Sequence, residues 1–183
     1  MNTILDVCNF LFMLVVVWIC VVLESTLLHE FFGMYKPALY IVVLAYFALN
    51  RFALEGGILA YVMGYVIEIN SGAPFGLYSV VLVLTFYAAK GISEGFFIKT
   101  PWAEMLLVGV ISLLYKIIFL GITSIYGSVT PILKISIISG VFIAFLNLLL
   151  TPLGFWVLKQ IDERLGKIRP FKTGTQEHRL RME

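Results

Sequence analysis

Long apolar runs separated by short polar connections constrain the fold of this 183-residue chain more than any other feature. Hydrophobic residues make up 61% of the sequence and charged residues only 13%, which is far from the average of soluble domains. A helix needs roughly 20 consecutive apolar residues to cross the hydrocarbon core of a membrane. The sequence therefore predicts an all-α integral membrane protein, a bundle of about six transmembrane helices in one domain.

The predicted spans follow one another closely. They cover residues 8–28, 38–53, 55–69, 75–89, 102–125 and 134–158, and together form a transmembrane domain of residues 1–158. The last span is interrupted at Thr151-Pro152-Leu153-Gly154, and residues 159–183 form a basic tail. The first apolar run follows a leader without Lys or Arg and precedes no small-residue cleavage site, so we expect it to remain as a span.

The distribution of basic residues predicts the orientation. Seven of the thirteen Lys and Arg residues lie in residues 159–183. With six spans, Arg51, Lys90 and Lys99 fall on the side of this tail, whereas Lys36 and the helix-end residue Lys134 fall on the other side. Basic residues accumulate on the cytoplasmic side of membrane proteins. We therefore expect both termini in the cytoplasm; a five-span chain would separate Lys90 and Lys99 from the tail.

Three ionisable residues are predicted to lie inside the membrane at a similar depth. At ~1.5 Å per helical residue, Glu24 lies ~24 Å, Glu68 ~20 Å and Lys116 ~22 Å from the cytoplasmic ends of their helices. Each would cost roughly 2.5–3.5 kcal/mol if it faced lipid at a helix centre. We therefore predict an intramembrane charge cluster in which Lys116 pairs with Glu68 and Glu24 lies nearby. In the alternative, Glu24 and Lys116 extend separately to the membrane interface.

Span 55–69 carries small residues at every fourth position. Gly56, Ala60 and Gly64 form this stripe, and Glu68 continues it. Small residues at this spacing let a second helix approach closely, so the pattern predicts a helix-packing face that ends at Glu68. The simpler explanation is that glycine is common in membrane helices.

Catalytic chemistry finds little support in the sequence. His29 and His178 are far apart and are expected on opposite sides of the membrane, and the known nucleophile, zinc and phosphate-loop motifs are missing. Cys8 and Cys20 have no metal-ligand spacing. The basic tail contains acidic residues and follows a span directly, which argues against nucleic acid. We expect a protein that is not an enzyme and that binds no cofactor, metal or nucleic acid.

One stretch of the chain resembles a known family signature. It runs from Gly64 through Glu68 and a group of turn-forming residues. The residues of this signature turn are Gly64, Ser71, Gly72, Pro74, Gly76 and Leu77. The pattern resembles that of the bacterial rod shape-determining protein MreD family, in which the acidic residue is usually aspartate. The match covers about fourteen residues, and the wider likeness includes Pro37 before the second span and Thr151-Pro152 in the last one.

The resemblance implies a non-catalytic, multi-pass subunit of the bacterial cell-elongation machinery in the inner membrane. Such subunits act in peptidoglycan synthesis with MreC, and also with MreB, RodA and a class B penicillin-binding transpeptidase. The family also looks like the substrate-binding subunits of energy-coupling-factor transporters, which implies an alternative function as a ligand-binding subunit of a vitamin-type transporter. A structural protein that faces only lipid remains a third interpretation.

These interpretations predict different surfaces. A vitamin-binding subunit needs polar groups in its outer loops, where Ser71, Tyr78, Ser124 and Ser128 are the main candidates. A partner-binding subunit needs apolar helix faces with small residues, which this chain has. We therefore expect a groove beside span 55–69 and residues 70–74 that receives a partner's transmembrane helix. The basic tail would contact anionic lipid or a cytoplasmic filament, or would only fix the topology.

Overall fold

The structure is a computed structural model that describes residues 2–24, 26, 37–95, 100–126 and 133–164. Within these residues there are six α-helices and no strand, which agrees with the all-α prediction. The helices are α1 (Asn2–Leu23), α3 (Leu39–Asn50), α4 (Ala53–Ser71), α5 (Leu77–Gly95), α6 (Pro101–Tyr126) and α7 (Leu133–Arg164). His29, Glu30, Lys36, Lys99 and the tail beyond Arg164 lie outside the described residues.

Three helices in the described part of the chain are long and apolar enough to cross a membrane. These segments are Leu77–Gly95 in α5, Pro101–Ser124 in α6 and Ser139–Arg164 in α7. Two shorter apolar helices, Phe10–Leu23 and Leu39–Asn50, accompany them. The chain is therefore a helical protein with the character of a membrane protein.

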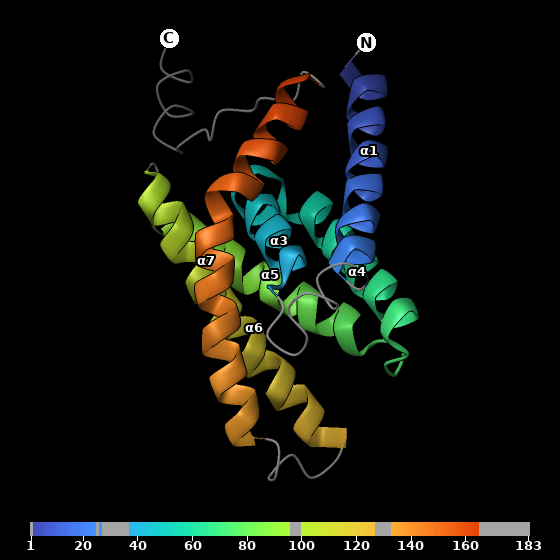
Figure 1. The fold of residues 1–183 in the computed structure, drawn as a ribbon. Coiled ribbons are helices and arrows are strands. Elements are labelled where there is room, and N and C mark those ends of the chain that lie inside the picture. Colours follow the sequence, from blue (N-terminus) through green and yellow to red (C-terminus); the bar gives the residue numbers. More distant parts are fainter. Residues whose placement is uncertain (1, 25, 27–36, 96–99, 127–132, 165–183) are drawn as a thin grey trace.

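Helix α3 occupies the centre of the bundle. It packs against all five of the other described helices, and residues Ile41 through Ala48 are buried without interruption (Figure 1). A helix that is apolar on every side is stable only when other helices surround it. Its 12 residues rise about 18 Å, less than the ~30 Å of a hydrocarbon core. The remaining helices therefore form a wall around a short central helix.

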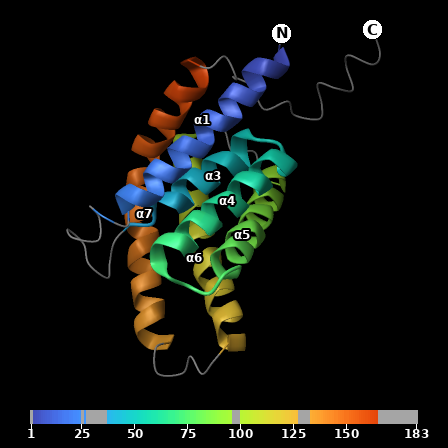
Figure 2. The ribbon, with the colours of Figure 1, turned by 90° about the vertical axis from the view of Figure 1, so that its right-hand side faces the viewer.

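The two ends of the described chain lie at the same end of the bundle. Figures 1 and 2 show the start of α1 beside the C-terminal end of α7. Figure 2 also shows α1 crossing α3 and α4 obliquely, and α1 packs against both. At the opposite end, α6 and α7 continue beyond the connection between α4 and α5 in both views.

Helix α7 differs from the prediction at Pro152. The sequence suggested an interruption at residues 151–154, but the helix continues through Pro152 to Arg164. Pro152 has no backbone N–H to donate to the preceding turn. The hydroxyl of Thr151 donates to the carbonyl oxygen of Asn147 at 2.7 Å. This bond lies in the turn before Pro152, whereas the carbonyl oxygen that the proline leaves without its usual donor is that of Leu148.

Candidate functional site

The connection between α4 and α5 is organised around the carboxylate of Glu68. The side chain is only 2% exposed. Its Oε2 accepts a hydrogen bond from the backbone N–H of Gly76 at 2.9 Å, and its Oε1 accepts one from the N–H of Ser79 at 2.7 Å. The first N–H groups of a helix have no partner within the helix, and the positive end of the helix dipole favours an anion. Glu68 therefore caps the N-terminus of α5 from the end of α4.

Two glycines make the reversal possible. Gly72 ends α4 in the left-handed conformation with φ of 66°, and its N–H donates to the carbonyl oxygen of Glu68 at 3.0 Å. Gly76 has φ of 89°. Both conformations are unfavourable for residues with a Cβ atom. Between the glycines, the carbonyl oxygen of Pro74 accepts the N–H of Leu77 at 3.3 Å. These signature residues thus act together in one reversal of the chain.

The small-residue stripe of α4 packs against α5 of the same chain. A Cβ atom on Gly64 would overlap the backbone of Ser79, and one on Gly56 would overlap the ring of Phe86. Ala60 is fully buried between them. The close approach at Gly64 also brings the first turn of α5 within reach of Glu68. The stripe therefore serves the α4–α5 hairpin rather than a free face for another protein.

The structure does not bring Glu68 and Lys116 together in the predicted ion pair. Among the ion pairs of the described residues none joins them, because the amides of α5 occupy the carboxylate. The ammonium of Lys116 lies 5.9 Å from the ring centroid of Phe119 instead. The methylene groups of Lys116 lie against Gly140 of α7, where a Cβ would come within 2.9 Å of Cγ.

Glu24 is buried at the end of α1. Its predicted place beside Glu68 and Lys116 stays a prediction. The hydroxyl of Tyr40 donates to that of Tyr115 at 2.9 Å. This hydroxyl pair joins α3 to α6.

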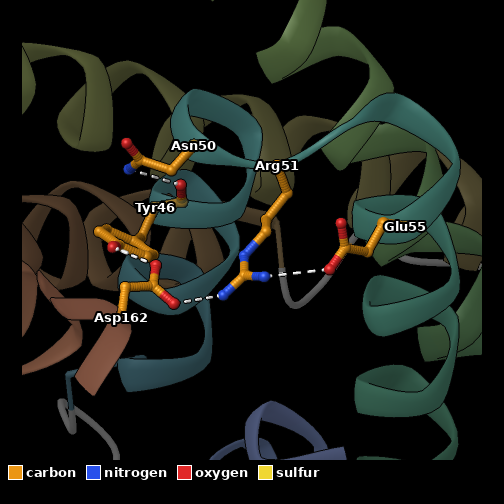
Figure 3. Close-up of polar contacts among 5 residues, drawn as sticks. All are labelled: Tyr46, Asn50, Arg51, Glu55 and Asp162. Carbon is orange, nitrogen blue, oxygen red and sulfur yellow. Dashed lines mark hydrogen bonds and ion pairs between the residues drawn. The ribbon is translucent and has the colours of Figure 1, made fainter. Parts of the chain in front are cut away.

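A second polar cluster lies at the end of the bundle that holds the C-terminal end of α7 (Figure 3). The guanidinium of Arg51, which is 4% exposed, contacts Asp162 of α7 at 2.5 Å and Glu55 of α4 at 3.0 Å. The hydroxyl of Tyr46 donates to the second carboxylate oxygen of Asp162 at 2.6 Å. A charge buried at this level requires partners of opposite charge. The cluster therefore connects the end of α3 to both α4 and α7.

Lys90 of α5 completes this arrangement. Its ammonium donates to the carbonyl oxygens of Ala48 and Arg51, at 2.9 Å and 2.8 Å. These are carbonyl groups at the C-terminal end of α3, where the helix dipole favours a cation. Arg51 and Lys90 entered the sequence analysis only as markers of orientation. Their contacts at the C-terminal end of α3 were not predicted from the sequence, because their partners come from other helices.

Asn147 of α7 fixes the other end of α3. Its side-chain oxygen accepts the N–H of Ala38 at 2.9 Å, and its amide nitrogen donates to the hydroxyl of Ser112 at 3.0 Å. Asn147 is fully buried. A polar amide in the middle of a long apolar run was the only sequence signal for this contact. Both ends of the central helix are thus held by side chains from other helices.

Comparisons with protein-family models, curated proteins and solved structures found no match to this chain. Over the residues that the structure describes, the protein is all-helical, with three helices that could span a membrane and a short buried central helix. No group of three or more metal-ligating side chains occurs within the part of the chain that the structure describes.

Proposed function

We propose that this chain is a non-catalytic subunit of a bacterial cell-elongation complex, related to the MreD family. In this proposal it crosses the inner membrane six times with both termini in the cytoplasm. The supporting observation is the joint use of the signature residues. One reversal of the chain uses Glu68, Gly64, Gly72 and Gly76 together, so that the residues of the signature form one structural unit.

Partner binding by this subunit is best placed on the outward face of α4. Residues of this face recur at helical spacing and are all exposed: Leu54, Ile58, Tyr61, Tyr65 and Ile69. Tyr61 is 56% exposed and lies near the middle of a 19-residue helix. Tyrosine is favoured at membrane interfaces rather than at the centre of the hydrocarbon layer. A partner helix would shield its hydroxyl group from lipid and provide it with a hydrogen-bond partner.

The partners proposed from the family resemblance are an MreC-like single-span protein and, through it, an MreB-like filament, a RodA-like glycosyltransferase and a class B transpeptidase. The groove predicted beside the small-residue stripe is not where we place them, because α5 already covers that stripe. The basic tail remains a candidate contact for a filament or for anionic lipid, and as a topology determinant.

Depletion in the native bacterium tests the proposal. We expect rod-shaped cells to become spherical and the protein to co-purify with an MreC-like partner. The Tyr61→Ala variant should lose the partner, whereas Leu106→Ala, which removes a similarly exposed side chain from α6, should retain it. Normal cell shape together with no co-purified partner would refute the proposed function.

A ligand-binding subunit of a vitamin-type transporter is the second candidate. The partly buried hydroxyl pair of Tyr40 and Tyr115 and the buried carboxylate of Glu24 favour it, because polar groups in an apolar interior can orient a small ligand. Deletion would then cause vitamin auxotrophy and leave cell shape unchanged.

A further inference from the structure

Lys116 is a charged residue that belongs neither to the proposed docking face on α4 nor to the reversal between α4 and α5. Within the described residues it forms no ion pair. The carboxylate predicted as its partner is occupied by two backbone amides of α5. An ammonium at membrane depth is unfavourable without a compensating anion.

The geometry around Lys116 holds its stem in a fixed place. Gly140 on α7 has no side chain, and the methylene groups of Lys116 lie in the space that a Cβ would fill. The ammonium then lies 5.9 Å from the ring centroid of Phe119, one turn further along α6. Lys116 is only half-buried in this position, so that a ligand outside the bundle can reach it.

Lys116 lies deeper than the usual level of lipid headgroups, and the neighbouring reversal brings that level closer to it. Tyr78, at the start of α5, packs on Phe119 with ring centroids 5.4 Å apart. The reversal, with exposed Asn70 and Ser71, therefore lies close to the level of Phe119. Figures 1 and 2 show α6 and α7 continuing past it. The hairpin helices α4 and α5 have 19 residues each against 26 in α6, so that we expect the bilayer beside the hairpin to be thinner and its headgroups to lie further inward.

A simple length estimate agrees with this position. Helix α6 has 26 residues and is about 39 Å long, so that centring it in a ~30 Å core leaves ~4–5 Å outside at each end. Lys116 lies ten residues, or ~15 Å, before Tyr126 at the end of α6. Its Cα is then ~10 Å below the edge of the hydrocarbon core. An extended lysine side chain covers about half of that distance, and a thinner bilayer beside the hairpin shortens the remainder.

We propose that Lys116 is a lipid-binding residue that binds the phosphate of an anionic phospholipid where α6 packs against Gly140 of α7. Lysine binds phosphate as a compact positive charge. The acyl chains would lie along the exposed apolar face of α6 that includes Leu113 and Ile117. The apolar chains and the charged headgroup would thus contact adjacent parts of one helix.

Native mass spectrometry of the full-length protein tests this proposal with phosphatidylglycerol and phosphatidylcholine. We expect the tightest-bound phosphatidylglycerol to bind roughly tenfold or more tightly than phosphatidylcholine, as one charge-assisted hydrogen bond provides. Lys116→Met should remove this preference and Lys116→Arg should restore it. Gly140→Ala should weaken it with the charge unchanged, because the new Cβ displaces the lysine stem.

The matched control is Lys159→Met, which removes a half-exposed lysine that pairs with Glu104 near the opposite end of α6. It should bind lipid as the wild type does, and the basic tail is present in every variant. Thermal melting in lipid-free detergent verifies that each variant is folded. Equal lipid binding by wild type and Lys116→Met, or equal affinity for the two lipids, would overturn the proposal. Displacement of the lipid by millimolar inorganic phosphate would show that the site takes free phosphate instead.

Discussion

Replacement of Glu68 tests whether the signature stretch is held by a helix cap or by an ion pair. Glu68→Ala would leave the backbone N–H of Ser79 without its acceptor in a buried site, and that of Gly76 without its acceptor in a partly exposed one. The buried amide costs about 1–3 kcal/mol when it is left without a partner, and the exposed one costs less because water can reach it. We therefore expect a loss of about 1–4 kcal/mol in the free energy of unfolding, measured in mixed micelles.

The stability of the conservative variants should lie between that of the wild type and that of Glu68→Ala. In Glu68→Gln the side-chain oxygen can still accept one N–H, but the charge is lost, so that about half of the destabilisation should remain. Glu68→Asp keeps the charge but is one methylene shorter and cannot span both amides without movement of the backbone. The expected order of stability is wild type, then Asp and Gln, and finally Ala.

A double-mutant cycle with Lys116 separates the two explanations. Because Glu68 binds amides of α5 and not Lys116, the effects of Glu68→Ala and Lys116→Met should add within about 0.3–0.5 kcal/mol. A coupling energy of about 1 kcal/mol or more would refute the cap as the main interaction. Recovery of stability in the charge-swapped variant Glu68→Lys with Lys116→Glu would refute it as well.

Three further changes test the remaining contacts by the same unfolding measurement. Gly64→Ala should cost about 1–3 kcal/mol because its Cβ meets the α5 backbone. The control Gly91→Ala, where the new Cβ meets no neighbouring atom, should be neutral or stabilising. Equal effects of the two changes would contradict the close approach of α4 and α5 at Gly64. Arg51→Met should cost about 3–5 kcal/mol by removing the buried cation that pairs with Asp162, while Lys159→Met, from a more exposed pair, should cost at most about 1 kcal/mol. Asn147→Leu should cost about 1–3 kcal/mol through the unpaired amide at the start of α3, and a neutral result would contradict that role.

The helices themselves were largely predictable because apolar runs and turn-forming residues are local signals. The prediction of span 55–69 falls within α4, and Gly72 and Pro74 lie in the reversal where turn chemistry places them. Helix ends were less accurate, since α1 begins at Asn2 and α7 continues to Arg164. In the sequence, Gly166 follows Arg164 by two positions, and glycine commonly follows the end of a helix, so this signal was overlooked.

The polar contacts were harder to predict because they depend on which way each helix faces. A count of residues gives the height of Glu68 and Lys116 in the membrane, but not their directions around the helix axes. Height alone suggested an ion pair. The actual donors are backbone amides eight and eleven residues later in the chain, which no side-chain pattern reveals.

The Arg51 cluster illustrates the same limit at the other end of the bundle. Asp162 lies 111 residues after Arg51, within a segment that reads as the beginning of a basic tail. An acidic residue among basic ones was a signal in retrospect, although nothing in the sequence specified its partner. Contacts between distant helices require the packing of the central helix α3 to be known first.

Site-specific photo-crosslinking tests the proposed docking function most directly. A photoreactive amino acid at position 61 of α4 should crosslink in living cells to one single-span membrane protein, because we place the partner's helix on this face. The same group at position 106 of α6, which is similarly exposed, should capture only lipid. Crosslinking of the same protein from both positions, or of lipid alone from position 61, would contradict the account.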